Sequence, residues 1–301
     1  MRILMTGATA GIGLEAAKRL LSQEGCELVV GARAPGKTPA VLNGRAELRA
    51  LDLESLDSVR GFAADILKAP PLDALVLNAG VQCVSRKTSA DGFELTFAVN
   101  HLAHYLLLRM LWPHMAEGGR IVITSSGTHY PAGAPGMPPP RHADARLLAW
   151  PDTDPDLDRG AMKAGQRAYA ASKLCNVMTA RELASRLAQA RPDLAIAAFD
   201  PGFTPGTGLA RHYPGPIGLI FRHVMPLFVR GGEHVSTPVS SGGLLADLVS
   251  SPLYQTARGG YFAVRGTRLE ERPPSALARD APACARLWEE SAALVGLAET
   301  A

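Results

Sequence analysis

Short apolar runs alternate along most of the chain with segments whose apolar residues recur at helical spacing. Residues 3–6 form the first apolar run, and Leu14, Ala17, Leu20 and Leu21 then make one helical stripe. Buried strands are short unbroken apolar runs, whereas amphipathic helices repeat with the helical period, so this pair predicts a strand followed by a helix. The same order recurs, and strands are expected at residues 3–6, 27–32, 48–51, 74–77, 120–124, 195–199 and 260–264.

Helices are expected between these strands. Ser55 is placed to cap the helix that follows the third strand. Strands that alternate with helices pair in parallel through right-handed crossovers. The pattern therefore predicts an α/β fold with a doubly wound parallel sheet. Further helices are expected at about residues 91–115, from 167 through 183, and at 233–248 and 282–294.

Composition narrows the class of protein. The chain has 301 residues, 47% of them hydrophobic, which is ample for a sizeable core. This length allows one large α/β domain or two smaller ones over residues 1–301, and no internal repeat or interdomain linker appears. A net charge of +3 without a run of Lys or Arg argues against a nucleic-acid partner.

Cysteine usage and hydropathy indicate the compartment. The cysteines (Cys26, Cys83, Cys175 and Cys284) are widely scattered, with no pair or Cys/His cluster spaced for zinc. Such sparse usage suits a reducing cytosol, so a cytoplasmic location is expected. No apolar run is long enough to span a membrane, and the first strand is too short for a signal segment. No integral membrane segment is therefore expected.

A glycine-rich turn follows the first strand and opens the first helix. Glycines permit a tight turn and let the backbone approach a pyrophosphate, which then lies at the helix N-terminus. The spacing Gly-x-x-x-Gly-x-Gly differs from the broader dinucleotide fingerprint, and a merely tight turn is the alternative. The expected cradle is Gly7-Ala8-Thr9-Ala10-Gly11-Ile12-Gly13.

Residues after the next three strands extend this cradle. Arg33 follows the second strand, where sites that prefer NAD usually place a carboxylate on the ribose 2′-hydroxyl. A guanidinium there favours a 2′-phosphate, and so NADP(H), unless Arg33 is only a solvated loop residue. Asp52, next to Leu53, is a candidate acceptor for the adenine amino group. Asn78-Ala79-Gly80 ends the fourth strand in a small turn over which a cofactor could lie.

Tyr169 and Lys173 are the strongest candidates for chemistry. Four residues apart on a helix, they share one face. An ammonium beside a phenol favours the phenolate and brings its pKa toward the working pH, which makes a proton-transfer pair. The alternative is an exposed tyrosine near a solvated lysine. Ser126 ends the fifth strand at the edge where ligands bind in such sheets.

Taken together and in this order, these motifs resemble those of the short-chain dehydrogenase/reductase family. The resemblance rests on Thr6-Gly7-x-x-x-Gly11-Ile12-Gly13, Asn78-Ala79-Gly80, Asn100, Ser126 and Tyr169-x-x-x-Lys173, and it covers nearly the whole chain. It implies one Rossmann-type NAD(P)-binding domain with a sheet of about seven strands. It also implies that Tyr169 is the general acid/base, that Lys173 lowers its pKa and holds the nicotinamide ribose, and that Ser126 orients the reacting oxygen. Asn100 would hold a water that links Lys173 to solvent.

Within that family the chain resembles the light-dependent protochlorophyllide reductases and the retinol-dehydrogenase-like group. Residues 99–104, 172–176, 201–202, 207–209 and 286–297 carry the likeness. Those reductases have a cysteine after the Pro-Gly pair, where this chain has Phe203, and another before the Asn-Ala turn, where it has Leu77. Light-driven chlorin reduction is therefore not expected. Cys175 matches a family position but lies on another helical face than Tyr169, which indicates packing.

Two further segments are expected to shape a substrate pocket. Residues 127–168 form a long insertion with dense proline, which excludes a regular element over that part. Such loops either rim a pocket or decorate the surface. Residues 203–231 combine apolar side chains with proline breaks, which predicts a lid over a lipophilic small-molecule substrate, with a membrane or dimer contact as the alternative. Either Thr204 or Thr207 is expected to contact the nicotinamide amide.

The resulting hypothesis is NADP(H)-dependent hydride transfer to or from a carbonyl/alcohol pair. Reduction of a conjugated C=C bond and a non-catalytic NADP(H)-binding sensor or scaffold stay open, and the resemblance implies a homodimer or homotetramer. The predicted catalytic residues are Tyr169, Lys173, Ser126 and Asn100, and no metal ligand is predicted. The predicted cofactor-binding residues are Gly7, Thr9, Ala10, Gly11, Ile12, Gly13, Arg33, Asp52, Leu53, Asn78, Ala79, Gly80, Tyr169, Lys173, Pro201, Gly202 and Thr204.

Overall fold

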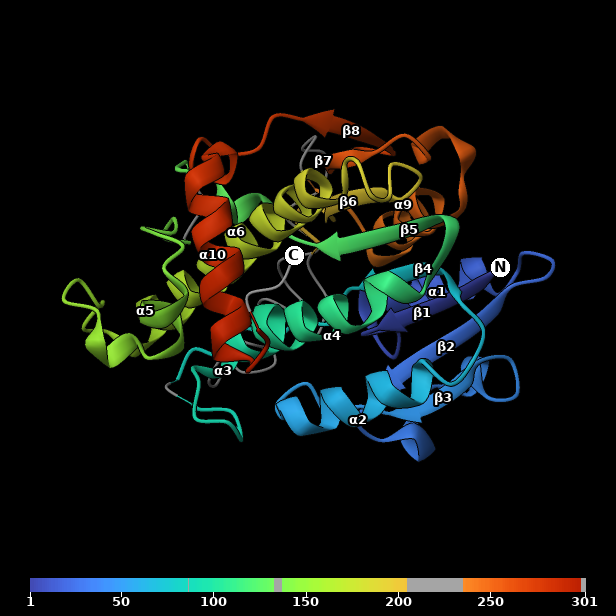
Figure 1. The fold of residues 1–301 in the computed structure, drawn as a ribbon, viewed down its shortest axis with the longest axis horizontal. Helices are drawn as coiled ribbons and strands as arrows, with labels where there is room; N and C mark the ends of the chain where they lie inside the picture. Colours follow the sequence, from blue (N-terminus) through green and yellow to red (C-terminus); the bar gives the residue numbers. More distant parts are fainter. Residues whose placement is uncertain (86, 133–136, 205–234, 299–301) are drawn as a thin grey trace.

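A central sheet runs through the protein with helices on both sides (Figure 1). The computed structural model describes residues 1–85, 87–132, 137–204 and 235–298. The strand order is β3-β2-β1-β4-β5-β6-β7-β8, which reverses direction on either side of β1, as in a doubly wound sheet. The strands are β1 (Arg2–Thr6), β2 (Glu27–Ala32), β3 (Glu47–Ala50), β4 (Leu72–Leu77), β5 (Met115–Thr124), β6 (Ala195–Asp200), β7 (Arg258–Arg265) and β8 (Arg268–Arg272).

The predicted α/β fold is confirmed, with one strand more than the expected number of about seven. β1 to β7 pair in parallel, and β8 pairs antiparallel with β7 at the edge of the sheet. The eighth strand follows β7 through a tight turn at Gly266, whose φ of 60° suits glycine.

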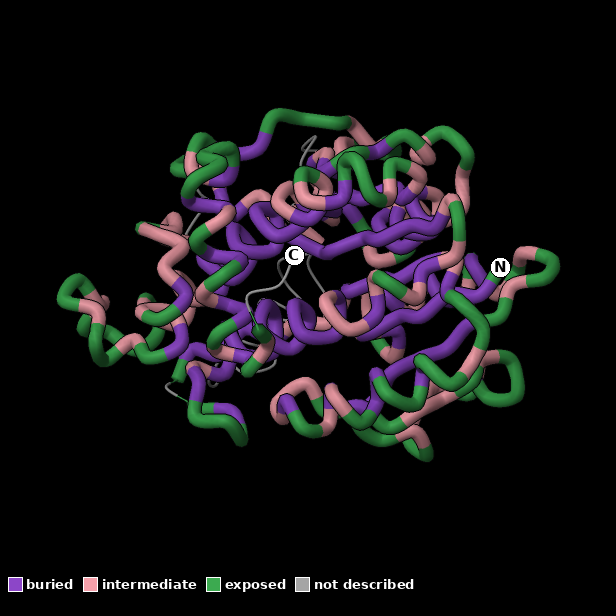
Figure 2. The backbone as a smooth tube through the Cα atoms, in the orientation of Figure 1, coloured by how far each residue is buried: buried purple, intermediate pink, exposed green. Residues whose placement is uncertain are grey.

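Two hydrophobic cores lie on opposite faces of the sheet, because successive strand residues point to opposite sides. Leu4 and Leu75 belong to one core and their neighbours Ile3 and Val76 to the other. Figure 2 shows the inner strands buried along most of their length, whereas the residues of the edge strands β3 and β8 are exposed or half-buried. The first core packs against α2 (Leu56–Ile66), α4 (Ala103–Leu111), α6 (Ala161–Leu187) and α10 (Ala281–Leu294), and the second against α1 (Gly11–Leu20) and α9 (Pro238–Ser250).

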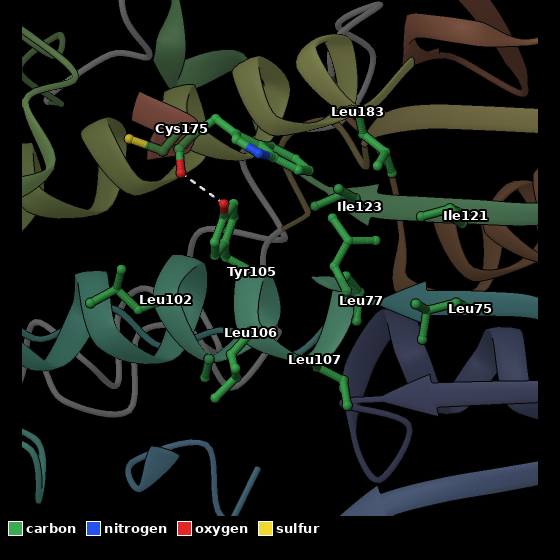
Figure 3. Packing of buried hydrophobic residues seen from close by; sticks show 14 of the residues in the cluster. Leu75, Leu77, Leu102, Tyr105, Leu106, Leu107, Ile121, Ile123, Cys175 and Leu183 are labelled. Carbon is green, nitrogen blue, oxygen red and sulfur yellow. Dashed lines mark hydrogen bonds between the residues drawn. The ribbon is translucent and has the colours of Figure 1, made fainter. Parts of the chain in front are cut away.

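Figure 3 looks into the first core, where Leu77 and Ile123 from the sheet face side chains of α4. Tyr105 is buried there, and its hydroxyl donates to the carbonyl oxygen of Trp288 on α10 at 2.7 Å. This contact ties α10 to α4 across the α6 side of the sheet. The helix α10 is thus packed into the first core.

The helix expected at residues 91–115 has a different start and a break inside it. The Glu94 carboxylate accepts from the Phe97 amide at 2.6 Å and caps a short helix, α3 (Leu95–Phe97). A π-helical turn, Ala98–Leu102, then leads into α4, and a 3-10 turn, Trp112–His114, ends the segment. The predicted start at residue 91 was wrong, because Glu94 caps the segment and helical structure begins only at Leu95. Inserted π-turns often mark functional sites.

Other boundaries also differ from expectation. α6 begins at Ala161, six residues before residue 167, and α9 begins at Pro238 because the Thr237 hydroxyl caps its first turn. The predicted insertion, residues 127–168, contains a 3-10 turn (Gly127–His129), α5 (Ala145–Ala149), a second 3-10 turn (Pro151–Thr153) and the first turns of α6. Most of the predicted lid, residues 203–231, lies outside the described residues.

Ion pairs hold the insertion against α6. The Asp158 carboxylate accepts from Arg167 on α6 at 2.5 Å and from Arg141 at 3.2 Å. Hydrogen bonds from Arg167 lower the pKa of Asp158 to about 2, so the network stays charged at neutral pH. Among the described residues, no helix combines the length and apolar character that crossing a membrane requires.

Candidate functional site

The glycine turn packs against the turn after β4 so closely that side chains are excluded. A Cβ on Gly13 would lie 2.1 Å from the Gly7 carbonyl oxygen and 2.6 Å from Asn78 Nδ2. Gly7 has a φ of 69°, and a Cβ there would meet the Ala79 backbone at 2.6 Å. No side chain caps the N-terminus of α1. The turn therefore presents bare backbone beside free helix amides, which is the arrangement that cradles a phosphate.

Hydrogen bonds fix the Asn78 turn to β1. The Thr6 hydroxyl oxygen accepts from the amides of Asn78 at 3.0 Å and Ala79 at 3.1 Å. Asn78 Nδ2 donates to the Gly7 carbonyl at 3.2 Å, and its Oδ1 accepts from the Thr124 hydroxyl at 3.1 Å. Gly80 then passes beside the reacting end, since a Cβ on it would lie 3.5 Å from Lys173 Nζ. The ends of β1, β4 and β5 thereby form one rigid floor.

Tyr169 and Lys173 are both buried on α6 above this floor. Tyr169 is 7% exposed and Lys173 3%, and the Lys173 ammonium lies 5.7 Å from the centre of the Tyr169 ring. Lys173 Nζ donates to the Thr124 carbonyl oxygen at 3.1 Å. Burial lowers the pKa of Lys173 to about 8, and the carboxylate of Asp200 opposes that change. The ammonium is therefore mostly charged near neutral pH, because its pKa lies only slightly above that pH.

Ser126 follows β5 and begins the 3-10 turn that packs against α6. Its half-buried hydroxyl accepts from the Thr128 amide at 3.4 Å, which leaves its proton free to be donated to a ligand. The imidazole of His129 lies under the same turn, with Nδ1 2.8 Å from the Ser126 carbonyl oxygen. Ser126 is thus held at the carboxyl edge of the sheet, on the α6 side.

The Pro201-Gly202 turn is held by a buried carboxylate that sequence reasoning missed. Asp200 Oδ1 accepts from the Gly202 amide at 3.0 Å, and its Oδ2 accepts from the Tyr261 hydroxyl at 2.7 Å. Gly202 has a φ of 70°, which requires glycine. The Thr204 hydroxyl lies 3.2 Å from the carbonyls of Pro201 and Gly202. Thr207, the alternative contact to a nicotinamide amide, lies outside the described residues.

Asn100 sits in the π-turn and links three segments. Its Oδ1 accepts from the Val81 amide at 2.8 Å, and its Nδ2 donates to the Val81 carbonyl at 2.9 Å and the Ser172 hydroxyl at 3.0 Å. Nδ1 of His104 lies 3.2 Å from the Asn100 carbonyl oxygen. The side chain of Asn100 is therefore fully engaged within the protein, and its expected role in holding a water through the main chain stays a prediction.

Arg33, Asp52 and Leu53 lie at the ends of β2 and β3, along the same carboxyl edge as the glycine turn. Arg33 is exposed, and its Nη1 lies 3.0 Å from Glu54 Oε1. Asp52 is exposed and its Oδ1 accepts from the Glu54 amide at 3.0 Å, whereas Leu53 is half-buried. The structure thus pairs Arg33 with a carboxylate that sequence reasoning missed, although Glu54 stands two residues after Asp52.

The described residues contain no clustered set of metal ligands, and the Cys175 thiol is buried. No group of three or more His, Cys, Asp or Glu side chains there is arranged to hold a metal ion. Cys175 is fully buried, and burial raises the pKa of its thiol, which fits the predicted packing role. Thr6, Thr124 and His104 support the floor but were not singled out for it, because their partners lie far away in the chain.

Comparison with known proteins agrees with this geometry. A family profile described as short chain dehydrogenase matches residues 1–136. A Streptomyces sp. (strain C5) protein assigned as a daunorubicin C-13 ketoreductase is 34% identical over 98% of this chain and 92% of its own length. The chloroplastic protochlorophyllide reductase B of Oryza sativa subsp. japonica is 32% identical over 98% of this chain and 77% of its own.

A solved structure gives the same result for the fold. The short chain dehydrogenase of Burkholderia cenocepacia J2315, crystallised in complex with NADP, superposes with a TM-score of 0.62 at 24% identity, over 88% of this chain and 96% of that one. The two relatives above thus match 98% of the chain, at 34% and 32% identity. The protein belongs to the short-chain dehydrogenase/reductase family.

Proposed function

We propose that this protein transfers hydride reversibly between NADP(H) and the carbonyl/alcohol pair of a small, lipophilic substrate. The observation that carries the proposal is the buried Tyr169–Lys173 pair, whose ammonium is anchored to the Thr124 carbonyl beside the nucleotide turn. The relative assigned as a ketoreductase supports carbonyl chemistry. Family membership and the NADP bound in the Burkholderia structure support the cofactor.

The residues present fit a dinucleotide. Gly7 and Gly13 leave a bare backbone cradle that any Cβ would fill, and the uncapped start of α1 offers amides to the pyrophosphate. Arg33 would hold the 2′-phosphate, after exchanging its contact with Glu54. When bound, NADPH supplies hydride from its nicotinamide ring. The Pro201-Gly202 turn and Thr204 would lie along that ring.

The chain's own residues would manage the proton. Tyr169 would donate its phenolic proton to the oxygen of the reduced carbonyl, and the nearby ammonium of Lys173 would stabilise the phenolate left behind. Ser126 would donate its hydroxyl proton to the same oxygen and hold it against Tyr169. In the direction of oxidation, Tyr169 would take the proton back from the alcohol.

A screen of NADPH oxidation over lipophilic aldehydes, ketones and enones, with NADH in parallel, tests the proposal. We expect NADPH-dependent formation of alcohols. The allylic alcohol from an enone is an isomer of the saturated ketone, so NMR of the separated products distinguishes the two. Saturated ketones from enones would instead establish reduction of a conjugated C=C bond, which the protochlorophyllide reductase relatives favour. NADPH binding without turnover over the whole panel would refute the proposed carbonyl chemistry and support the sensor or scaffold alternative.

The location, the assembly and the role of the insertion are proposed on separate grounds. A cytoplasmic protein is proposed from the scattered cysteines, all of which are free. A homodimer or homotetramer is proposed from the family resemblance. The insertion at residues 127–168 is proposed to rim the substrate pocket.

A further inference from the structure

His104 lies at the junction of the segments that build the site. It is 2% exposed on the first turn of α4. Its Nε2 lies 2.9 Å from the Thr6 hydroxyl oxygen, at the end of β1, and its Nδ1 lies 3.2 Å from the Asn100 carbonyl oxygen, in the π-turn. The imidazole of His104 thus links β1, which leads into the glycine turn, to the π-turn that contains Asn100. The side-chain amide of Asn100 donates to the hydroxyl of Ser172, which precedes Lys173.

The hydrogen bonds around Thr6 determine which nitrogen of His104 carries the proton. A hydroxyl has one proton to donate and two lone pairs. The amides of Asn78 and Ala79 occupy both lone pairs, at 3.0 and 3.1 Å. The Thr6 hydroxyl must therefore donate its proton to His104 Nε2, which acts as the acceptor. Nδ1 then carries the ring proton and donates it to the Asn100 carbonyl.

The neutral ring is favoured independently by its surroundings. Burial lowers the pKa of His104 to about 4, and the charge of Lys173 acts in the same direction. A second proton on Nε2 would also face the hydroxyl proton of Thr6. The imidazole of His104 therefore stays neutral near neutral pH. Its Nε2 accepts from Thr6 at the nucleotide turn, and its Nδ1 donates to the carbonyl of Asn100, whose side chain contacts α6.

We propose that His104, neutral and protonated on Nδ1, is a positioning residue that couples the nucleotide turn to the catalytic end of α6. Through Thr6 it holds the Asn78-Ala79 turn against the glycine cradle. Through the Asn100 carbonyl it holds the π-turn, and with it the contact between Asn100 and Ser172. The expected effect of His104 on turnover rests on the proposed function, whereas its tautomer and its effect on NADPH affinity do not rest on turnover.

The two sides can be separated by substitution. In His104→Gln the side-chain amide oxygen can reach the position of Nε2 and accept from Thr6, while the Nδ1 donor is lost. In His104→Asn an amide nitrogen replaces the Nδ1 donor to Asn100, while Thr6 loses its acceptor. Because a net hydrogen bond inside a protein is worth about one kcal/mol, each loss should change its readout by about five- to tenfold.

The decisive experiment measures NADPH affinity by fluorescence titration and turnover with an active carbonyl substrate in both variants. We expect His104→Gln to keep the NADPH dissociation constant within about twofold and to lose about five- to tenfold in kcat, and His104→Asn to do the reverse. His114→Gln is the matched control and should equal the wild type in both, because the Nε2 of His114 lies 2.9 Å from the Ala69 carbonyl oxygen, which precedes β4 at the opposite edge of the sheet. Parallel changes in affinity and kcat in both variants, or no change in either, would overturn the proposal.

The tautomer gives a readout that needs neither variant nor turnover. Long-range proton–nitrogen NMR correlations of the wild-type protein, assigned by the signal that His104→Gln removes, should show Nδ1 protonated and Nε2 bare. A proton on Nε2 would overturn the proposal. Absence of turnover in the wild-type protein would refute the proposed function alone, and the tautomer and NADPH affinity would then decide the role of His104.

Discussion

Replacing Lys173 with methionine should stabilise the ligand-free protein near neutral pH while removing its activity. Lys173 carries its charge in a buried site, and its ammonium donates to the Thr124 carbonyl oxygen. Asn176 Nδ2 donates to the same oxygen at 3.0 Å, so that carbonyl keeps a partner after the substitution. Methionine has nearly the same shape as the lysine stem. The substitution therefore removes a desolvated charge without leaving a buried polar group unpaired.

The magnitude follows from the pKa of Lys173, which burial lowers from 10.5 to about 8. At about 1.4 kcal/mol per pKa unit, charging Lys173 in the folded protein costs about 3 kcal/mol. Below about pH 8 lysine is protonated in both the folded and unfolded states, so the whole cost is present. Between about pH 8 and 10.5 the folded protein releases this proton first, the unfolded chain binds more protons, and wild-type stability from this group rises with pH.

The advantage of Lys173→Met should therefore shrink as pH rises. Linkage gives a contribution of about 3 kcal/mol at about pH 7 and about 1 kcal/mol at about pH 9.5, so the gap should fall by about 2 kcal/mol. Urea unfolding of both proteins at these two pH values measures it. Lys68→Met, at a lysine whose side chain is 75% exposed, is the matched control and should show no such change. A gap between Lys173→Met and the wild type that is the same at both pH values would refute the reasoning.

Two further predictions concern the cofactor cradle. Arg33→Ala should weaken NADPH binding about tenfold or more and leave NADH binding unchanged, because a charge-assisted contact to the 2′-phosphate is lost. Glu54→Gln should strengthen NADPH binding, because it releases Arg33 from its ion pair. Titration with both nucleotides measures these changes, and equal effects on NADH binding would remove the case for Arg33. Gly13→Ala should destabilise the fold by about 1–3 kcal/mol, since its Cβ would lie 2.1 Å from the Gly7 carbonyl oxygen. Gly61→Ala, in open space on α2, should stabilise the fold by about 0.5–1 kcal/mol, and urea unfolding that ranks the two variants in the opposite order would contradict the geometry.

The sequence pattern predicts the inner parallel strands well because each contains an apolar run next to a turn signal, whereas the parallel edge strand β3 alternates polar and apolar residues. β8 lacks such a run: Arg268-Leu269-Glu270-Glu271-Arg272 is polar because it is an exposed edge strand that pairs only with β7. The start of α6 was also missed. Its first turns hold Gly165, against which Cys83 packs so closely that a Cβ would lie 2.0 Å from the Cys83 carbonyl oxygen, and glycine there hides the helical pattern.

The candidate site divides in the same way. Local motifs such as the glycine turn and the Tyr169–Lys173 spacing are visible in the sequence, since both partners lie within one turn or helix. Contacts such as Thr6 with His104, 98 residues away, depend on which strands become neighbours in the sheet. The pairing of Arg33 with Glu54 likewise depends on β2 lying beside β3. No spacing rule reveals such partners before the fold is known.

The central claim is that Tyr169 supplies the proton for reduction of a carbonyl by NADPH. The most direct test is Tyr169→Phe, compared with the wild type by NADPH titration and by single-turnover oxidation of bound NADPH with an active ketone or aldehyde. The phenyl ring keeps the packing of a side chain that is 7% exposed and removes only the hydroxyl. We predict an NADPH dissociation constant within about twofold of the wild type and a rate of hydride transfer reduced about 10²-fold or more. Hydride transfer at the wild-type rate in Tyr169→Phe would contradict the account.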